Sequence, residues 1–131
     1  MKKSINAPIN VEFENTMVVK PTDLASYHGS GKAEVFATPA MIAFMEATCN
    51  EWFSQFLPEG YISVGAAINI RHLRPTPVNR KVRCVASYQG IQDKSHKFET
   101  KVYDGDKLLG EGYQLGGVVN KEKFEMNSHK D

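Results

Sequence analysis

One helical segment stands ahead of four strand-forming segments, and this order restricts the fold more than any other feature of the sequence. Residues 36–60, FATPAMIAFMEATCNEWFSQFLPEG, have the apolar spacing of a helix. Thr38 is a preferred N-cap and Pro39 suits the first helical position. We therefore expect one long helix that begins there and ends near Leu57, before the Pro-Glu-Gly sequence.

The segments after the helix have the composition of β-strands. They are rich in Val, Ile, Tyr and Phe, are separated by turn residues, and read YISVGAAINIRHL, KVRCVASYQGI, HKFETKVYD and KLLGEGYQLGGVV. The spacer DGDK, residues 104–107, predicts a hairpin. A further strand is expected at residues 16–21, followed by a turn-rich region at 22–34 that is either a mobile flap or an ordinary loop. These elements predict an α+β fold, with one antiparallel sheet wrapped around a central helix.

Length and charge favour one domain without a nucleic-acid or membrane partner. The 131 residues, 41% of them hydrophobic, suit a single domain over residues 1–131, with an ordered core at about 8–125 and a polar C-terminal tail that frays. The net charge of +1 provides no field for nucleic acid or anionic lipid. No segment approaches the roughly 20 apolar residues of a membrane span, and the amino terminus lacks the apolar run of a secretory signal.

The two cysteines, Cys49 and Cys84, occur in apolar patterns rather than in a CxxC or CxxH spacing. We expect free, buried thiols in a reducing cytoplasm rather than a disulfide. The four histidines show no metal-ligand spacing, and the chain has no glycine-rich phosphate loop, so neither metal nor nucleotide chemistry is predicted.

A carboxylate interrupts the apolar face of the predicted helix. At about 100° per residue, Glu46 falls close to Ile42, Cys49 and Phe53, with Asn50 as its only polar near neighbour. A buried carboxylate without a partner costs several kcal/mol, so it must be paired, protonated or directed into a cavity. Burial against a structural partner at a subunit interface explains Glu46 equally well.

A histidine on the next strand is a candidate partner. Val64, Ala66, Ile68 and Ile70 share one face of that strand by alternation, and the same parity reaches His72. The helix and the strand thus each supply one ionisable group to the same interior. Taken alone, His72 fits a satisfied core residue and Thr38 fits a helix cap.

Three segments resemble the small hot-dog-fold thioesterases related to fluoroacetyl-CoA thioesterase: VFATPAMIAFMEA, SVGAAINIRHLRPTPVNRKVR and GEGY. The resemblance extends over residues 8–125. Its signature is a Thr before the central helix, a Glu eight residues later and a His 34 residues after the Thr, which Thr38, Glu46 and His72 match. The Gly seven residues before the His is Gly65. In the last strand the chain reads GEGYQLGGVV where the family commonly reads GxGTHERxVV, so a basic residue is absent there.

This resemblance implies a hot-dog fold and hydrolysis of an acyl-CoA to a free acid and CoA, without metal or organic cofactor. Thr38 would be the nucleophile or would position the attacking water, and His72 would take and return the proton. Glu46 would orient the imidazole or attack directly. Backbone N–H groups near Gly65 and at the helix start are candidate donors to the oxyanion.

The resemblance also implies where a substrate would bind. Phe36 and Met41 would line a pocket for a small or medium acyl group. The basic stretch RHLRPTPVNRK, with Arg71 and Arg74, would lie under the CoA phosphates, although a solvated rim explains these charges as simply.

Helix geometry bears on the assembly. Eight residues of helix separate Thr38 and Glu46 by about 12 Å along the axis. Either His72 bridges them or the site combines two chains. Because hot-dog domains are usually dimers with active sites at the interface, we expect a homodimer. A non-catalytic protein that binds or senses acyl-CoA is the alternative function, while the acid–base motif of a hot-dog dehydratase is not found.

Overall fold

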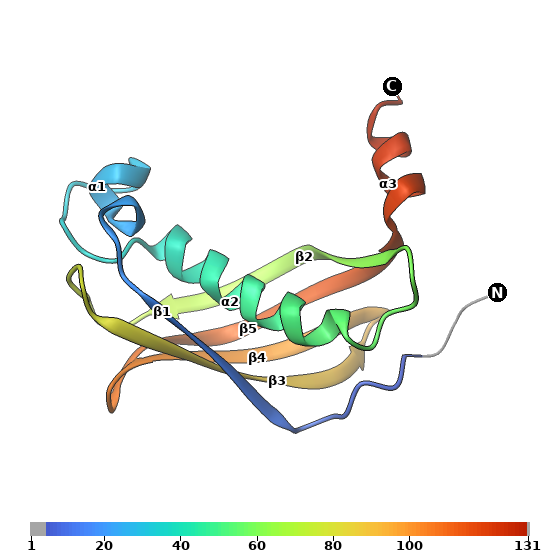
Figure 1. The fold of residues 1–131 in the computed structure, drawn as a ribbon, viewed down its shortest axis with the longest axis horizontal. Coiled ribbons are helices and arrows are strands. Elements are labelled where there is room, and N and C mark those ends of the chain that lie inside the picture. Colours follow the sequence, from blue (N-terminus) through green and yellow to red (C-terminus); the bar gives the residue numbers. More distant parts are fainter. Residues whose placement is uncertain (1–4, 131) are drawn as a thin grey trace.

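The computed structural model describes residues 5–130, in which one antiparallel sheet wraps around one long helix (Figure 1). Residues 1–4 and 131 lie outside the described part. They belong to the amino terminus, for which no secretory signal is predicted, and to the polar tail. The elements in chain order are β1 (Glu12–Val18), the 3-10 helix η1 (Pro21–Asp23), α1 (Ala25–His28), α2 (Thr38–Ser54), β2 (Tyr61–His72), β3 (Lys81–Gln92), β4 (Ser95–Asp104), β5 (Lys107–Asn120) and α3 (Lys121–Ser128). The predicted α+β arrangement is confirmed.

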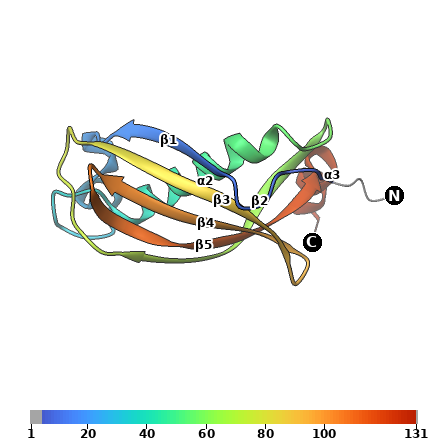
Figure 2. The same ribbon diagram turned by 90° about the horizontal axis from the view of Figure 1, so that it is seen from below.

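The five strands form one sheet in the order β1-β3-β4-β5-β2, with every neighbouring pair antiparallel. Figures 1 and 2 show α2 lying across one face of this sheet. β1 and β2 are therefore the two edge strands. None of the helices in residues 5–130 combines the length and apolar character that a membrane crossing requires.

The predicted strands after the helix are confirmed to within a residue or two at their ends. The DGDK spacer forms the expected hairpin, in which Asp104 pairs with Lys107 and Gly105 adopts φ +59°. The first strand differs, because it begins at Glu12 and ends at Val18 instead of spanning residues 16–21. Pro21, which has no N–H to donate, starts η1 instead of extending the strand.

The core consists of two clusters along α2. At the start of the helix, Met41 and Met45 pack with aliphatic residues of the sheet. At its end, Phe53 packs with Tyr88 and Phe98, with ring centroids about 5 Å apart. Both cysteines are buried and free, as predicted.

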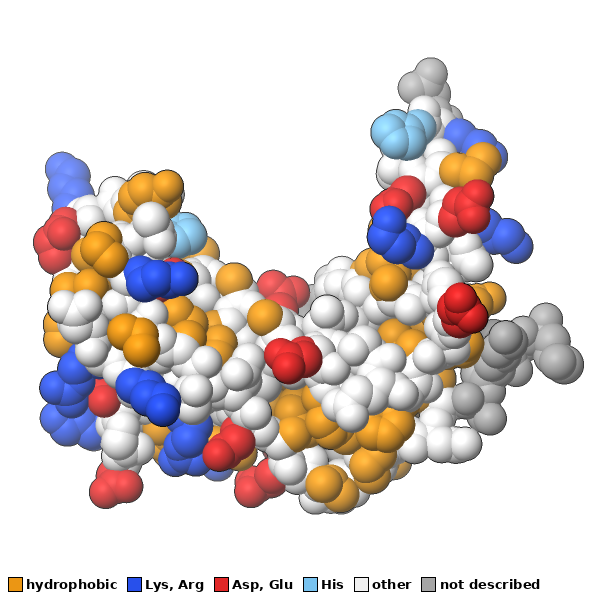
Figure 3. Space-filling view, in the orientation of Figure 1, with side chains coloured by type: hydrophobic (Ala, Val, Ile, Leu, Met, Phe, Trp, Pro, Cys, Tyr) orange, Lys and Arg blue, Asp and Glu red, His pale blue; other side chains and the backbone are white. Residues whose placement is uncertain are grey.

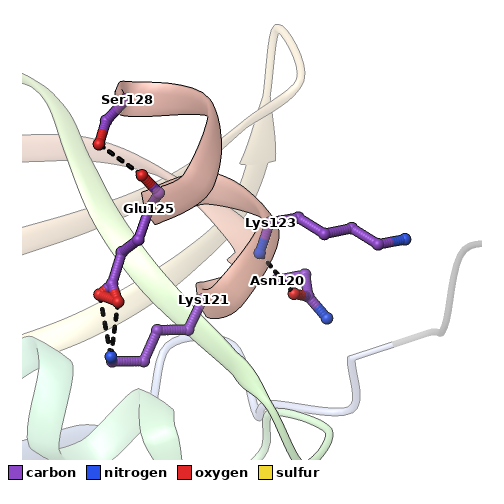
Figure 4. Close-up of polar contacts among 5 residues, drawn as sticks. All are labelled: Asn120, Lys121, Lys123, Glu125 and Ser128. Carbon is purple, nitrogen blue, oxygen red and sulfur yellow. Dashed lines mark hydrogen bonds and ion pairs between the residues drawn. The ribbon is translucent and has the colours of Figure 1, made fainter. Parts of the chain in front are cut away.

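The polar C-terminal segment was expected to fray, but it forms α3, which stands away from the sheet (Figure 1). Asn120 Oδ1 accepts a hydrogen bond from Lys123 N at 3.0 Å and caps the helix (Figure 4). Lys121 and Glu125 form an i,i+4 ion pair at 2.8 Å. These local contacts support a helix that a hydrophobicity pattern does not reveal.

A β-bulge changes which side chains of β2 face α2. The register with β5 shifts between Gly65 and Ala67. Before the bulge, Ser63 faces the helix, where its Oγ donates to Asn50 Oδ1 at 2.8 Å. After it, Ile70 packs against the core. The predicted inward parity therefore holds after the bulge and is wrong for Val64.

Candidate active site

Thr38 lies at the start of α2, but it does not cap the helix. Ala37 occupies the N-cap position without a side-chain hydrogen bond, and α2 ends at Ser54 rather than near Leu57. The Thr38 Oγ1 is 2.7 Å from Nδ1 of His72, the last residue of β2. The hydroxyl is therefore bonded to an imidazole 34 residues away, and the prediction that it caps the helix is wrong.

His72 is suited to accept a proton. Burial lowers the pKa of its imidazole below the usual value of 6.5, so the ring is neutral at neutral pH. A neutral ring whose Nδ1 accepts from the Thr38 hydroxyl carries its own proton on Nε2. That nitrogen is buried and has no hydrogen-bond partner among residues 5–130. The pair is a hydroxyl held against a neutral base, the arrangement that activates a nucleophile.

A pocket surrounds this pair, which we call the Thr38 pocket. Phe36 and Arg74 line it together with residues of the segment after α1, among them Ser30. Phe36 is almost fully buried, so it is both a core residue and part of the pocket wall. Phe36 and Arg74, both predicted to bind substrate, thus lie beside Thr38 and His72.

Glu46 lies elsewhere and is exposed in the single chain. A Cβ placed on Gly65 would come within 2.9 Å of Glu46 Oε2, so the carboxylate lies against the backbone of β2 at Gly65. The prediction that Glu46 points into the buried helix face is wrong. Thr48 is buried instead, because its Oγ1 donates to the Phe44 carbonyl at 2.8 Å and its polarity is satisfied within the helix.

A second pocket, which we call the Glu46 pocket, has a volume of about 320 Å³. It lies between α2 and strands β2, β4 and β5, and its lining residues are Glu46, Ala47, Cys49, Asn50, Phe53, Ser63, Val64, Gly65, His96, Phe98, Gln114, Leu115, Gly116 and Gly117. Sequence reasoning missed His96 and Gln114 here. The alternation of HKFETKV, which places His96 on the same face as Phe98, is the signal that identifies His96 as inward-facing.

Two predicted substrate-binding residues lie outside both pockets. Met41 is fully buried in the core, where a Cβ on Gly110 would collide with its thioether. Arg71 is directed to the other face of the sheet, where its Nη2 donates to Glu111 Oε2 at 3.1 Å. Its side chain is 71% exposed, so this ion pair contributes little stability.

Within one protomer the candidate residues thus form two separate groups. Thr38 and His72 occupy one pocket, and Glu46 and Gly65 meet at the other. No hydrogen bond joins His72 to Glu46 in the described part of the chain, so His72 does not bridge Thr38 and Glu46. No three His, Cys, Asp or Glu side chains of residues 5–130 gather closely enough to hold a metal ion.

Known proteins share this sequence and fold. The Fluoroacetyl-CoA-specific thioesterase family matches residues 19–122. Fluoroacetyl-CoA thioesterase from Streptantibioticus cattleyicolor is 31% identical over 91 residues, which are 70% of this chain and 66%, slightly under two thirds, of that enzyme.

Solved structures extend the likeness to nearly the whole chain. A variant of the fluoroacetyl-CoA-specific thioesterase FlK superposes with a TM-score of 0.87 at 25% identity, covering 95% of this chain and 96% of that one. A thioesterase superfamily member from Thermus thermophilus gives 0.83 at 25% identity, covering 92% and 90%. A hot-dog-like protein from Thermanaerovibrio acidaminovorans gives 0.82 at 21% identity, with the same coverage. The fold is the hot-dog fold.

Proposed function

The chain belongs to the fluoroacetyl-CoA-specific thioesterase family, and from this membership we propose that it hydrolyses a small or medium acyl-CoA to a free acid and CoA. The observation that carries the proposal is the 2.7 Å contact between Thr38 Oγ1 and His72 Nδ1. Thioester hydrolysis needs a nucleophile, a base to activate it and donors for the developing oxyanion. A hydroxyl bonded to a neutral imidazole supplies the first two.

In the proposed reaction, His72 takes a proton from the Thr38 hydroxyl or from a water that Thr38 positions. The activated oxygen attacks the thioester carbonyl, and the negative charge on the carbonyl oxygen is stabilised by backbone N–H groups at the start of α2 and near Gly65 of the partner subunit. The carbon–sulfur bond then breaks, and the proton returns from His72 to the thiolate of CoA. If Thr38 is the nucleophile, a water hydrolyses the resulting ester by the same proton transfers.

Glu46 completes this site from a second chain in our proposal. It would orient or stabilise the imidazolium of His72 in the partner's site, or attack the carbonyl as a carboxylate. Its own protomer supports a shared site, because Glu46 lies about 12 Å along α2 from Thr38 and next to the edge strand β2.

The edge strand β2 supports a homodimer. It is twelve residues long, and no other strand of residues 5–130 pairs with its outer side. Ala66, Ala67 and Ile68 are exposed along it. A long uncovered edge of this kind pairs readily with another chain. The molecule is also hollowed over α2, between the ends formed by α1 and α3 (Figure 3).

The CoA phosphates would lie near Arg74, which lines the Thr38 pocket. Arg71 lies on the opposite sheet face with Glu111, and Arg80 is bound to Asp104 at 3.0 Å. Arg74 is therefore the cation best placed for a phosphate that approaches Thr38.

Mixing two inactive variants tests both the activity and the shared site. Thr38→Ala and Glu46→Gln are each expected to release almost no thiol from a panel of acyl-CoAs. If each site takes Thr38 and Glu46 from different chains, a hybrid dimer has one intact site. Random exchange of equal amounts makes about half of the dimers hybrids, so activity recovers to roughly a quarter of the wild-type value.

A mixture of Thr38→Ala with His72→Ala is the matched control, because these residues share one chain's pocket and no hybrid site is intact. Recovery of activity in this control contradicts the shared site. So does the absence of recovery in the first mixture once hybrid dimers have formed. Tight binding of acyl-CoA by the wild type without thiol release would favour the alternative, a protein that binds or senses acyl-CoA.

A further inference from the structure

The Glu46 pocket contains polar groups that thioester hydrolysis does not require. Besides Glu46, they are His96 and Gln114 on the sheet and the hydrogen-bonded pair Asn50 and Ser63. A volume of about 320 Å³ is that of a small-ligand site. No Lys or Arg of residues 5–130 lines this pocket.

His96 is held in one protonation form. The Tyr88 hydroxyl is 2.6 Å from His96 Nδ1, and both side chains are buried. Burial lowers the pKa of His96 and raises the pKa of Tyr88, so both are neutral at neutral pH. With the phenol as the donor to Nδ1, the imidazole carries its proton on Nε2, and His96 is an N–H donor in the pocket wall.

Packing fixes the position of this donor. The Phe53 ring lies 5.1 Å from both His96 and Tyr88, between centroids, and Tyr88 also lies 5.0 Å from Phe98. Rings packed on several sides have few alternative rotamers. The direction of the His96 N–H is therefore set before any ligand arrives.

Gln114 offers the complementary group. It pairs in register with Phe98 of β4, and both line the pocket. Its Oε1 is buried and has no hydrogen-bond partner within residues 5–130. A buried amide oxygen without a partner lowers stability, and a ligand that donates to it removes this penalty.

We propose that the Glu46 pocket selects acyl groups that carry a hydroxyl group, which accepts from His96 Nε2 and donates to Gln114 Oε1. This inference rests on the proposed function, because it places the acyl chain of the thioester on the Glu46 side of the site. A plain alkyl chain leaves both polar groups without partners. An acyl chain ending in a carboxylate meets Glu46 and the Gln114 oxygen, and no Lys or Arg of the described residues lines the pocket to offset its charge.

The test compares acyl-CoAs that differ only in polarity: butyryl-CoA, the three positional isomers of hydroxybutyryl-CoA, and succinyl-CoA. At least one hydroxybutyryl isomer should have a kcat/KM roughly tenfold or more above that of butyryl-CoA, since sites built to bind a hydroxyl reject analogues that lack it. Equal values for butyryl-CoA and all three isomers, or the highest value for succinyl-CoA, would overturn the proposal.

Two variants assign the selectivity to these residues. Gln114→Leu should bring the hydroxybutyryl-to-butyryl ratio to about one, while Gln92→Leu, the same change at an exposed position at the end of β3, should leave it unaltered. Tyr88→Phe keeps the packed ring and removes the hydroxyl that fixes His96, so it should lower the same ratio. A ratio unchanged in both Gln114→Leu and Tyr88→Phe contradicts the assignment.

Binding measurements distinguish a failure of this inference from a failure of the proposed function. Non-hydrolysable thioether analogues of the butyryl and hydroxybutyryl substrates can be compared by calorimetry. Absence of thiol release from every substrate contradicts the proposed hydrolysis. Tighter binding of a hydroxybutyryl analogue still supports the polar pocket, and equal binding of all analogues overturns it.

Discussion

The substitution Gly65→Ala should displace the Glu46 carboxylate without lowering the stability of the fold. A Cβ at Gly65 would lie 2.9 Å from Glu46 Oε2, whereas ordinary contact begins at 3.4 Å. The carboxylate must therefore move by about 0.5 Å, the difference between 3.4 and 2.9. Glu46 is exposed and can move at little cost. Because Gly65 does not adopt a positive φ, alanine there should leave stability unchanged or raise it by about 0.4–1 kcal/mol.

Activity should respond differently from stability. A misplacement of about 1 Å in a catalytic site can cost about a hundredfold, so a shift of about half that size predicts a loss of roughly tenfold in kcat/KM. Thiol release from acyl-CoA measures the activity, and thermal unfolding of the same preparation measures the stability.

Gly31→Ala is the matched control. Its added Cβ would meet Ala25 Cβ at 3.6 Å, an ordinary contact, and Gly31 lines neither the Thr38 pocket nor the Glu46 pocket. A kcat/KM for Gly65→Ala within about twofold of the wild type, at unchanged stability, would refute the reasoning that Glu46 must be held where it is.

Two further predictions concern His72 and Met41. The value of kcat/KM should rise with pH and level off above the pKa of His72, which burial lowers below 6.5, because only the neutral imidazole accepts a proton. Thr38→Val should reduce the plateau of this pH profile by about 10²- to 10⁴-fold. A rise in kcat/KM centred above pH 6.5 would argue against His72 as the base. Met41→Ala should lower the free energy of unfolding in urea by about 2–5 kcal/mol, because Met41 is fully buried, and a loss below about 1 kcal/mol would contradict its placement in the core.

The sheet could be predicted from the sequence because its signals are local. Alternation and turn residues define the strands from Tyr61 onward, and DGDK defines the last hairpin. The α3 helix was not predicted, because it is stabilised by the Asn120 cap and an ion pair rather than by an apolar face.

The site was predicted only in part, because its geometry depends on contacts between distant residues. The helical wheel treats Thr48 as polar, whereas its hydroxyl is satisfied by the Phe44 carbonyl and the side chain is buried, so the buried face of α2 is rotated away from Glu46. Thr is a favourable residue type for a helix cap, but the Thr38 hydroxyl is hydrogen-bonded to His72 instead. Gln114 enters the Glu46 pocket only because β5 pairs with β4, a relation that no local pattern reveals.

The bulge in β2 has a consequence for how this chain can vary. Gly65 and His72 are seven residues apart, an odd number that in a regular strand would put them on opposite faces. The extra residue at the bulge shifts the alternation of the strand, so that Gly65 and His72 both face α2. At Ala66, the presence of a residue therefore matters more than its side chain. Substitutions there keep this alternation, whereas the loss of one residue would turn one half of the site away from α2 while every catalytic side chain remained in the sequence.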